Sequence, residues 1–125
     1  MSDDSGEKDE DDYCNPIERS LSLDAVLSLL ADERRRDLVR FLVEEVDETA
    51  SVRECTEHVV ECEQVRTGDR PAYDQVEMKL HHVHVPKLAS SGIIEYDPRN
   101  REFRYHGHEA VESWLDRIQA HEDTG

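Results

Sequence analysis

Residues 76–106 constrain the fold more than any other segment, because they read as a helix, a glycine stop and a β-hairpin. Apolar residues recur at helical spacing up to Leu88, and Gly92 suits the left-handed position just after a helix. Two short runs then alternate apolar and polar residues, and the turn sequence DPRN at 97–100 separates them. This order predicts a helix followed by a hairpin whose tip carries arginines.

Three further helices are predicted before this segment. Ser22 is a suitable N-cap for the first, and the second is expected over about 32–46. The third opens with a Ser51–Glu54 capping box and extends to about Cys62. The polar stretch 64–72 then predicts a long loop before the fourth helix.

The fourth helix, expected over 72–91, has two distinct faces. Pro86 lacks a backbone N–H and is expected to kink the helix near residue 82. At 100° per residue one face is apolar. This inward stripe consists of Tyr73, Val76, Leu80, His84 and Leu88. The opposite face carries Gln75, Lys79, His82 and Pro86, with Met78 at its margin.

Together these elements predict a mainly α fold with a β-hairpin wing, a winged helix-turn-helix. In that fold one helix enters a groove of DNA and the hairpin contacts the backbone beside it. Glutamine can bond adenine, while lysine and histidine can donate to guanine. Arginines on the hairpin would hold phosphates or reach the minor groove. The candidate DNA-binding residues are Gln75, Lys79, His82, Arg99, Arg101 and Arg104; the alternative is that they are merely solvated.

The segment Leu88-Ala-Ser-Ser-Gly92-Ile-Ile resembles the junction between recognition helix and wing in ArsR-like winged-helix repressors. More closely, the chain resembles a haloarchaeal family of small winged-helix domains. The resemblance covers residues 21–106 and is most specific over 80–97. It implies a role in transcription regulation. Its remaining hallmarks here are Leu23-Asp24 with Leu30, Arg34-Arg35-Arg36, the run LHHVHVPKL at 80–88, and Ile94-Glu95-Tyr96-Asp97.

The charge of the chain opposes DNA binding in dilute salt. The net charge is −16, and residues 1–18 alone contribute −7. Residues 1–20 are expected to be a disordered acidic tail. Only three of the 15 basic residues are lysines, a composition that resembles halophilic archaeal proteins. At molar salt the Debye length is about 3 Å, so repulsion between exposed charges is largely screened.

Residues 107–121 predict a last helix with a narrow apolar stripe. Such a stripe either packs on its own domain or pairs with a second copy, and we favour the dimer. The predicted dimer contacts are Val111, Trp114, Leu115 and Ile118.

Two clusters admit more than one interpretation. The arginines at positions 34, 35, 36 and 40 either pair with the surplus carboxylates of the chain or contact DNA phosphates. Cys55, His58 and Cys62 share a helix face and raise the alternative of a metal-responsive regulator, but zinc needs about four ligands in a tetrahedral array. We expect Cys55 and His84 to be core residues, and we predict no metal site and no cofactor.

Other classes of function have little support. No Gly-rich phosphate loop, nucleophile elbow or HExxH motif is present, so we do not expect an enzyme. No apolar run is long enough to span a membrane, and the acidic start is not a secretory signal, which favours the cytoplasm. The partners expected are double-stranded DNA and a second copy of the chain. The main alternative is an acidic protein–protein interaction module on the same scaffold.

Overall fold

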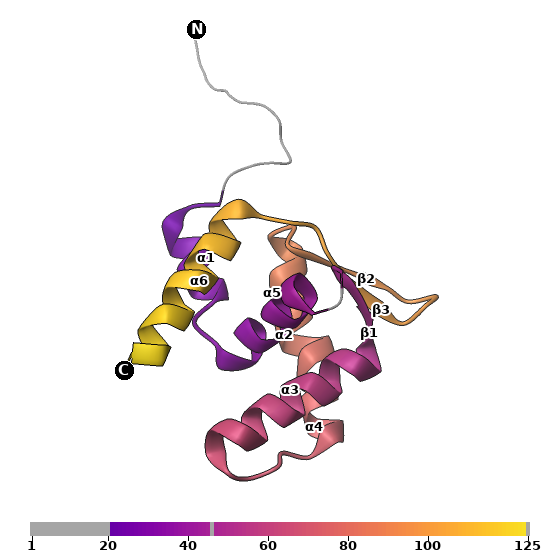
Figure 1. The fold of residues 1–125 in the computed structure, drawn as a ribbon. Helices are drawn as coiled ribbons and strands as arrows, with labels where there is room; N and C mark the ends of the chain where they lie inside the picture. Colours follow the sequence, from indigo (N-terminus) through magenta and orange to yellow (C-terminus); the bar gives the residue numbers. More distant parts are fainter. Residues whose placement is uncertain (1–20, 46, 125) are drawn as a thin grey trace, which may run out of the picture.

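The computed structural model describes residues 21–45 and 47–124, which form helices and a small three-stranded antiparallel sheet (Figure 1). The architecture is the predicted winged helix-turn-helix, with the β2–β3 hairpin as its wing. The tail predicted at 1–20 lies outside the described residues. In chain order the elements are α1 (Leu23–Leu29), α2 (Glu33–Glu44), β1 (Thr49–Ser51), α3 (Val52–Thr67), α4 (Tyr73–Lys79), η1 (Leu80–His84), α5 (Val85–Ser90), β2 (Ile94–Asp97), β3 (Glu102–Tyr105) and α6 (Glu109–Thr124).

Short polar side chains fix where the first helices begin. The hydroxyl of Ser22 accepts from the backbone N–H of the third residue after it at 3.0 Å. The carboxylate of Asp32 caps α2 in the same way. Ser51 and Glu54 form a reciprocal capping box at the start of α3. These contacts satisfy N–H groups that have no partner inside the helix, and they confirm the predicted starts.

Helix α3 is longer than the sequence indicated, so the predicted loop at 64–72 is wrong in its first half. The apolar stripe ends at Cys62, but the helix continues to Thr67 and is closed by Gly68 in the left-handed conformation, with φ +86°. Ion pairs to α2 stabilise these polar turns. Glu63 bonds Arg34 through both carboxylate oxygens, at 2.7 and 3.0 Å.

The fourth predicted helix is one continuous segment composed of α4, η1 and α5, here called the recognition helix. Its middle, Leu80–His84, is a π-helical turn in which the Val85 N–H donates to the Leu80 carbonyl. Pro86 follows directly and has no N–H to donate. The disturbance predicted near residue 82 is therefore present as a wider turn, which accommodates the proline without ending the helix.

The sheet contains a strand that the sequence did not predict. The strand order is β1-β3-β2, so β3 is central and Phe103 is paired with both Ala50 and Tyr96. The predicted hairpin is confirmed, and the side chain of Asp97 accepts from the Arg99 N–H at 3.0 Å in its turn. β1 is three residues long and depends on pairing with a distant segment, so its own sequence gives too little alternation to detect.

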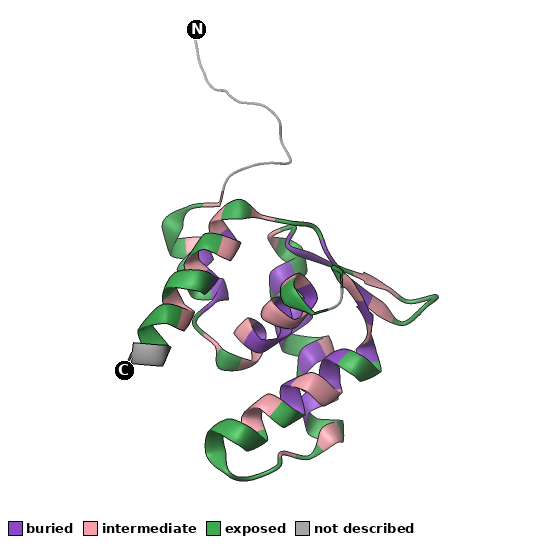
Figure 2. Ribbon diagram, viewed as in Figure 1, coloured by how far each residue is buried: buried purple, intermediate pink, exposed green. Residues whose placement is uncertain are grey.

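The hydrophobic core lies between α2, α3, the recognition helix and the inner face of the sheet (Figure 2). On the recognition helix, Val76, Leu80, His84 and Leu88 are buried and Tyr73 is half-buried. The predicted inward stripe is therefore confirmed. The largest fully buried side chains include Tyr105, Phe103, Leu30, Leu38, Leu42, Leu80, Leu88, Ile93 and Ile94.

Helix α6 packs against α1 of the same chain, on the side of the body away from the wing tip (Figure 1). Val111 is 1% exposed and Leu115 is 3% exposed, both within this chain's own core. Trp114 and Ile118 are half-buried against that core. The prediction that Val111 and Leu115 form a dimer contact is therefore wrong, because their apolar surface is already covered within the chain.

No helix in the described part of the chain is long and apolar enough to cross a membrane.

Candidate nucleic-acid interface

The outer face of the recognition helix presents the three predicted base-contacting residues together. Gln75, Lys79 and His82 are all exposed. They follow one another at intervals of four and three residues, each close to one helical turn, so they lie along one side of the helix. Met78 and Val83 are 52% and 47% exposed on the same segment. This surface thus combines hydrogen-bonding groups with apolar atoms suited to base edges and thymine methyl groups.

The wing places its arginines at and near the tip of the hairpin, and Arg99, Arg101 and Arg104 are all exposed. Arg101 has φ +52° and closes the loop between the strands. Its guanidinium lies 3.4 Å from the carboxylate of Glu77 on the recognition helix. This ion pair joins the wing to the recognition helix within the chain.

Two acidic residues of the wing are held by neighbours. Hydrogen bonds from the Asn100 side chain and backbone lower the pKa of Asp97, which therefore stays ionised while it stabilises the turn. Glu95 lies opposite Arg104 in the sheet register and 2.9 Å from the ring of His106. Hydrogen bonds from a neutral amide do not remove the charge of Asp97, so the arginines of the wing lie among acidic side chains and do not form a continuous basic patch.

A stretch without acidic residues covers most of the recognition helix. Residues 78–94 contain no Asp or Glu, although the chain has 31 acidic residues. The same stretch holds two of the three lysines, Lys79 and Lys87, and three of the seven histidines. This absence of acidic residues is visible in the sequence alone. From Met78 to Ser90 the recognition helix therefore exposes no carboxylate, while Asp74 and Glu77 flank Gln75 in its first turns.

Behind this face, a buried polar group connects the recognition helix to the α1–α2 junction. Arg35 donates through Nε to the Leu29 carbonyl at 2.7 Å and through Nη2 to the Ser28 carbonyl at 3.2 Å. Its Nη1 lies 3.2 Å from Nδ1 of His84, whose other ring nitrogen is 4.0 Å from Asp32. Burial lowers the pKa of His84, and Arg35 lowers it further against the opposing effect of Asp32. His84 is therefore a neutral, hydrogen-bonded core residue, as predicted.

The arginine cluster of α2 pairs within the chain. Arg34 bonds Glu63 at 2.7 Å, and this bond lowers the pKa of that carboxyl group. Arg35 is buried, and Arg36 donates to the Leu30 carbonyl at 2.6 Å and to Glu122 at 3.1 Å. Of the two interpretations left open by the sequence, pairing with carboxylates describes Arg34 and Arg36, whereas Arg35 bonds backbone carbonyls and His84.

The cysteines and histidines are dispersed. Cys55 is fully buried, and burial raises the pKa of its thiol to about 12. Cys62 lies 3.3 Å from Nε2 of His58. His81 is half-buried and packs edge-on against Tyr96, with ring centroids 5.2 Å apart. In residues 21–45 and 47–124, no three His, Cys, Asp or Glu side chains are arranged to hold a metal ion.

Comparison with known proteins identifies a family for most of the fold. Residues 27–104 match DUF7344, a domain of unknown function, from the second half of α1 to β3. Helix α6 lies beyond the matched residues. No curated protein and no solved structure matches the chain. Because the matched residues make up more than half of the sequence, the chain belongs to the DUF7344 family.

Proposed function

We propose that this protein is a cytoplasmic, sequence-specific DNA-binding regulator of transcription. The observation that carries the proposal is that the outer face of the recognition helix from Met78 to Ser90, which includes Lys79 and His82, has no acidic residue. In a chain of net charge −16 a solvated helix face would ordinarily carry carboxylates, whereas on a face that lies in a groove of DNA they would be repelled by the phosphates.

Base recognition is assigned to three side chains of the recognition helix. Gln75 would form a bidentate pair with adenine, and Lys79 and His82 would donate to guanine acceptors in the major groove. The buried stripe of the same helix, in which His84 lies 3.2 Å from Arg35, holds these groups in place. A contact set held on a rigid helix of this kind discriminates bases better than one carried by a loop.

Backbone contact is assigned to the wing. Arg99 and Arg104 would approach phosphates, and Arg101 would exchange the carboxylate of Glu77 for a phosphate oxygen. At 3.4 Å and in an exposed position this ion pair is weak, so exchanging it costs little. Counterion release contributes little in molar salt, and hydrogen bonds and shape would supply most of the affinity.

A second copy of the chain is part of the proposal, since a two-fold dimer places two recognition helices about 34 Å apart on a pseudo-palindrome. The dimer contact cannot use Val111 and Leu115, which are buried within the chain. Leu23 and Leu27 on α1 are 54% and 38% exposed, and they leave an apolar strip beside α6. The same strip supports the alternative function, an acidic scaffold that binds another protein.

The test is genome-wide occupancy followed by gel shift on the enriched sites, both in molar KCl. We expect enrichment at a short sequence motif, and loss of the specific complex in Lys79→Ala and His82→Ala. Arg117→Ala is the matched control, because Arg117 is exposed on α6 and stacks on Trp114 at 5.2 Å, away from the wing. Absence of enriched sites, or equal effects of the control and the helix variants, would refute the proposal.

A further inference from the structure

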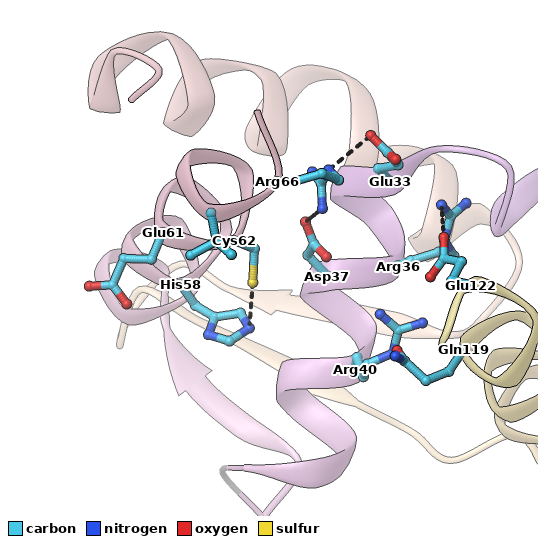
Figure 3. Close-up of a pocket in the computed structure, with 11 residues that line it drawn as sticks. Glu33, Arg36, Asp37, Arg40, His58, Glu61, Cys62, Arg66, Gln119 and Glu122 are labelled. Atoms are coloured by element: carbon cyan, nitrogen blue, oxygen red, sulfur yellow. Dashed lines mark hydrogen bonds and ion pairs between the residues drawn. The ribbon is translucent and has the colours of Figure 1, made fainter. Parts of the chain in front are cut away.

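A groove of about 760 Å³ lies on α2, between α3 and α6, and is separate from the recognition face (Figure 3). Its size is within the range of sites for small organic ligands. Figure 3 shows Cys62 and His58 on the α3 side and Gln119 and Glu122 on the α6 side. The remaining lining residues are Glu33, Arg36, Asp37, Arg40, Glu61, Val65 and Arg66.

Most charges in this groove are already paired. Arg66 bonds Glu33 at 3.0 Å and Asp37 at 3.2 Å. Arg36 bonds Glu122 at 3.1 Å. These pairs form the rim and neutralise one another, so they leave little capacity to hold a further ion.

Arg40 is different. Within the described residues, its Nη2 atom is buried and has no hydrogen-bond partner. A guanidinium N–H in that position loses its bonds to water without replacement, which is unfavourable unless a ligand supplies an acceptor. In Figure 3 the Arg40 guanidinium points from α2 toward α6, into the space beside Gln119. Among the described residues that line the groove, Nη2 of Arg40 is thus a cationic donor atom without a partner.

The α3 side of the groove determines which kind of ligand body can lie beside Arg40. Cys62 and the ring of His58 line the α3 side, and Val65 is an exposed apolar residue at the rim. The ring of His58 is stacked on Phe41 at 4.3 Å and is therefore fixed in place. Three arginines face four carboxylates in the lining, so a multiply charged anion such as phosphate would lack compensating positive charge.

We propose that this groove binds a small organic monocarboxylate, with the carboxylate on Arg40 and an apolar body against Cys62 and Val65. The assignment of ligand class follows from the single free donor, the volume and the apolar wall. If the proposed DNA-binding function holds, such a ligand would act as an effector, because α3 packs directly on α4 of the recognition helix. Binding itself does not depend on that function.

The test is an NMR titration of the ¹⁵N-labelled full chain, without DNA, using benzoate, phenylacetate and hexanoate as probes. Benzamide is the neutral counterpart of benzoate, and inorganic phosphate is the small anion. We expect saturable shifts of amide signals in α2, α3 and α6 with at least one carboxylate. Benzamide should bind the wild type at least roughly tenfold more weakly than benzoate does. The Arg40→Gln variant should likewise bind benzoate at least roughly tenfold more weakly than the wild type does, because each change removes a charge-assisted hydrogen bond.

Substitutions at Val65 test the site without touching the core, since this side chain is 88% exposed. Both Val65→Glu and Val65→Lys remove the apolar contact, but only glutamate adds repulsion, so Val65→Glu should weaken carboxylate binding more than Val65→Lys does. Arg117→Gln is the control for loss of a positive charge elsewhere. The proposal is overturned if no carboxylate shifts these signals, if phosphate or benzamide binds equally well, or if Arg40→Gln and Val65→Glu bind like the wild type.

Discussion

Packing of α6 within its own chain predicts a large cost for Leu115→Ala. Leu115 is 3% exposed, so nearly all of its transfer free energy, about 1.5–3 kcal/mol, is realised on folding. The cavity left by truncation adds to this, and we expect the free energy of unfolding to fall by about 2–5 kcal/mol. For a domain of this size the midpoint of thermal unfolding should drop by roughly 10 °C or more.

The assay is urea unfolding followed by circular dichroism, repeated over a wide range of protein concentrations in the same KCl. Leu23→Ala is the matched control: it removes the same atoms from a side chain that is 54% exposed, and it should cost less than about 1 kcal/mol. Packing within the chain predicts that the loss for Leu115→Ala is independent of concentration. A loss below about 1 kcal/mol, or one that appears only where dimers form, would refute our assignment.

Three further outcomes follow from local contacts. Because the pKa of His84 is lowered in the folded protein, the unfolded chain takes up the proton first as the pH falls. The free energy of unfolding should therefore be constant above pH 6.5, the ordinary pKa of histidine, and decline below it. Urea unfolding should show a steeper decline in the wild type than in His84→Asn. Ser51→Ala removes one arm of the capping box and should lower the free energy of unfolding by about 0.5–2 kcal/mol, measured the same way. After iodoacetamide treatment of the folded protein, mass spectrometry should find Cys62 alkylated slowly and Cys55 unmodified. The reason is that Cys55 is 0% exposed and the pKa of its thiol is about 12. Rapid labelling of Cys55 would contradict the packing described.

The parts of the fold that sequence could predict are those encoded locally. Ser22 and Ser51 stand directly before residues with apolar helical spacing, and Asp32 stands before the charged first turn of α2, so each helix start depends on a few adjacent residues. The Gly92 stop and the turn at 97–100 are equally local, and both are present. The outward position of Gln75, Lys79 and His82 followed from the period of the recognition helix alone.

What sequence could not predict depends on contacts between distant segments. β1 exists only because β3 pairs with it, some fifty residues later in the chain. The last turns of α3 are polar and are stabilised by ion pairs to α2, such as Arg34–Glu63. The stripe of α6 suits either a neighbouring helix or a second chain, and only the position of α1 decides between them. The unused donor of Arg40 is likewise visible only when its neighbours are in place.

The π-helical turn at Leu80–His84 has a consequence for how this helix can change over generations. Such a turn holds one more residue than an ordinary helical turn, so it is the natural place for a single-residue gain or loss. Because the wider turn already absorbs the extra residue, losing Val83, whose side chain is 47% exposed, would restore regular winding and leave Leu88 directed into the core. The helix can thus shorten by one codon at this point without turning its buried stripe outward.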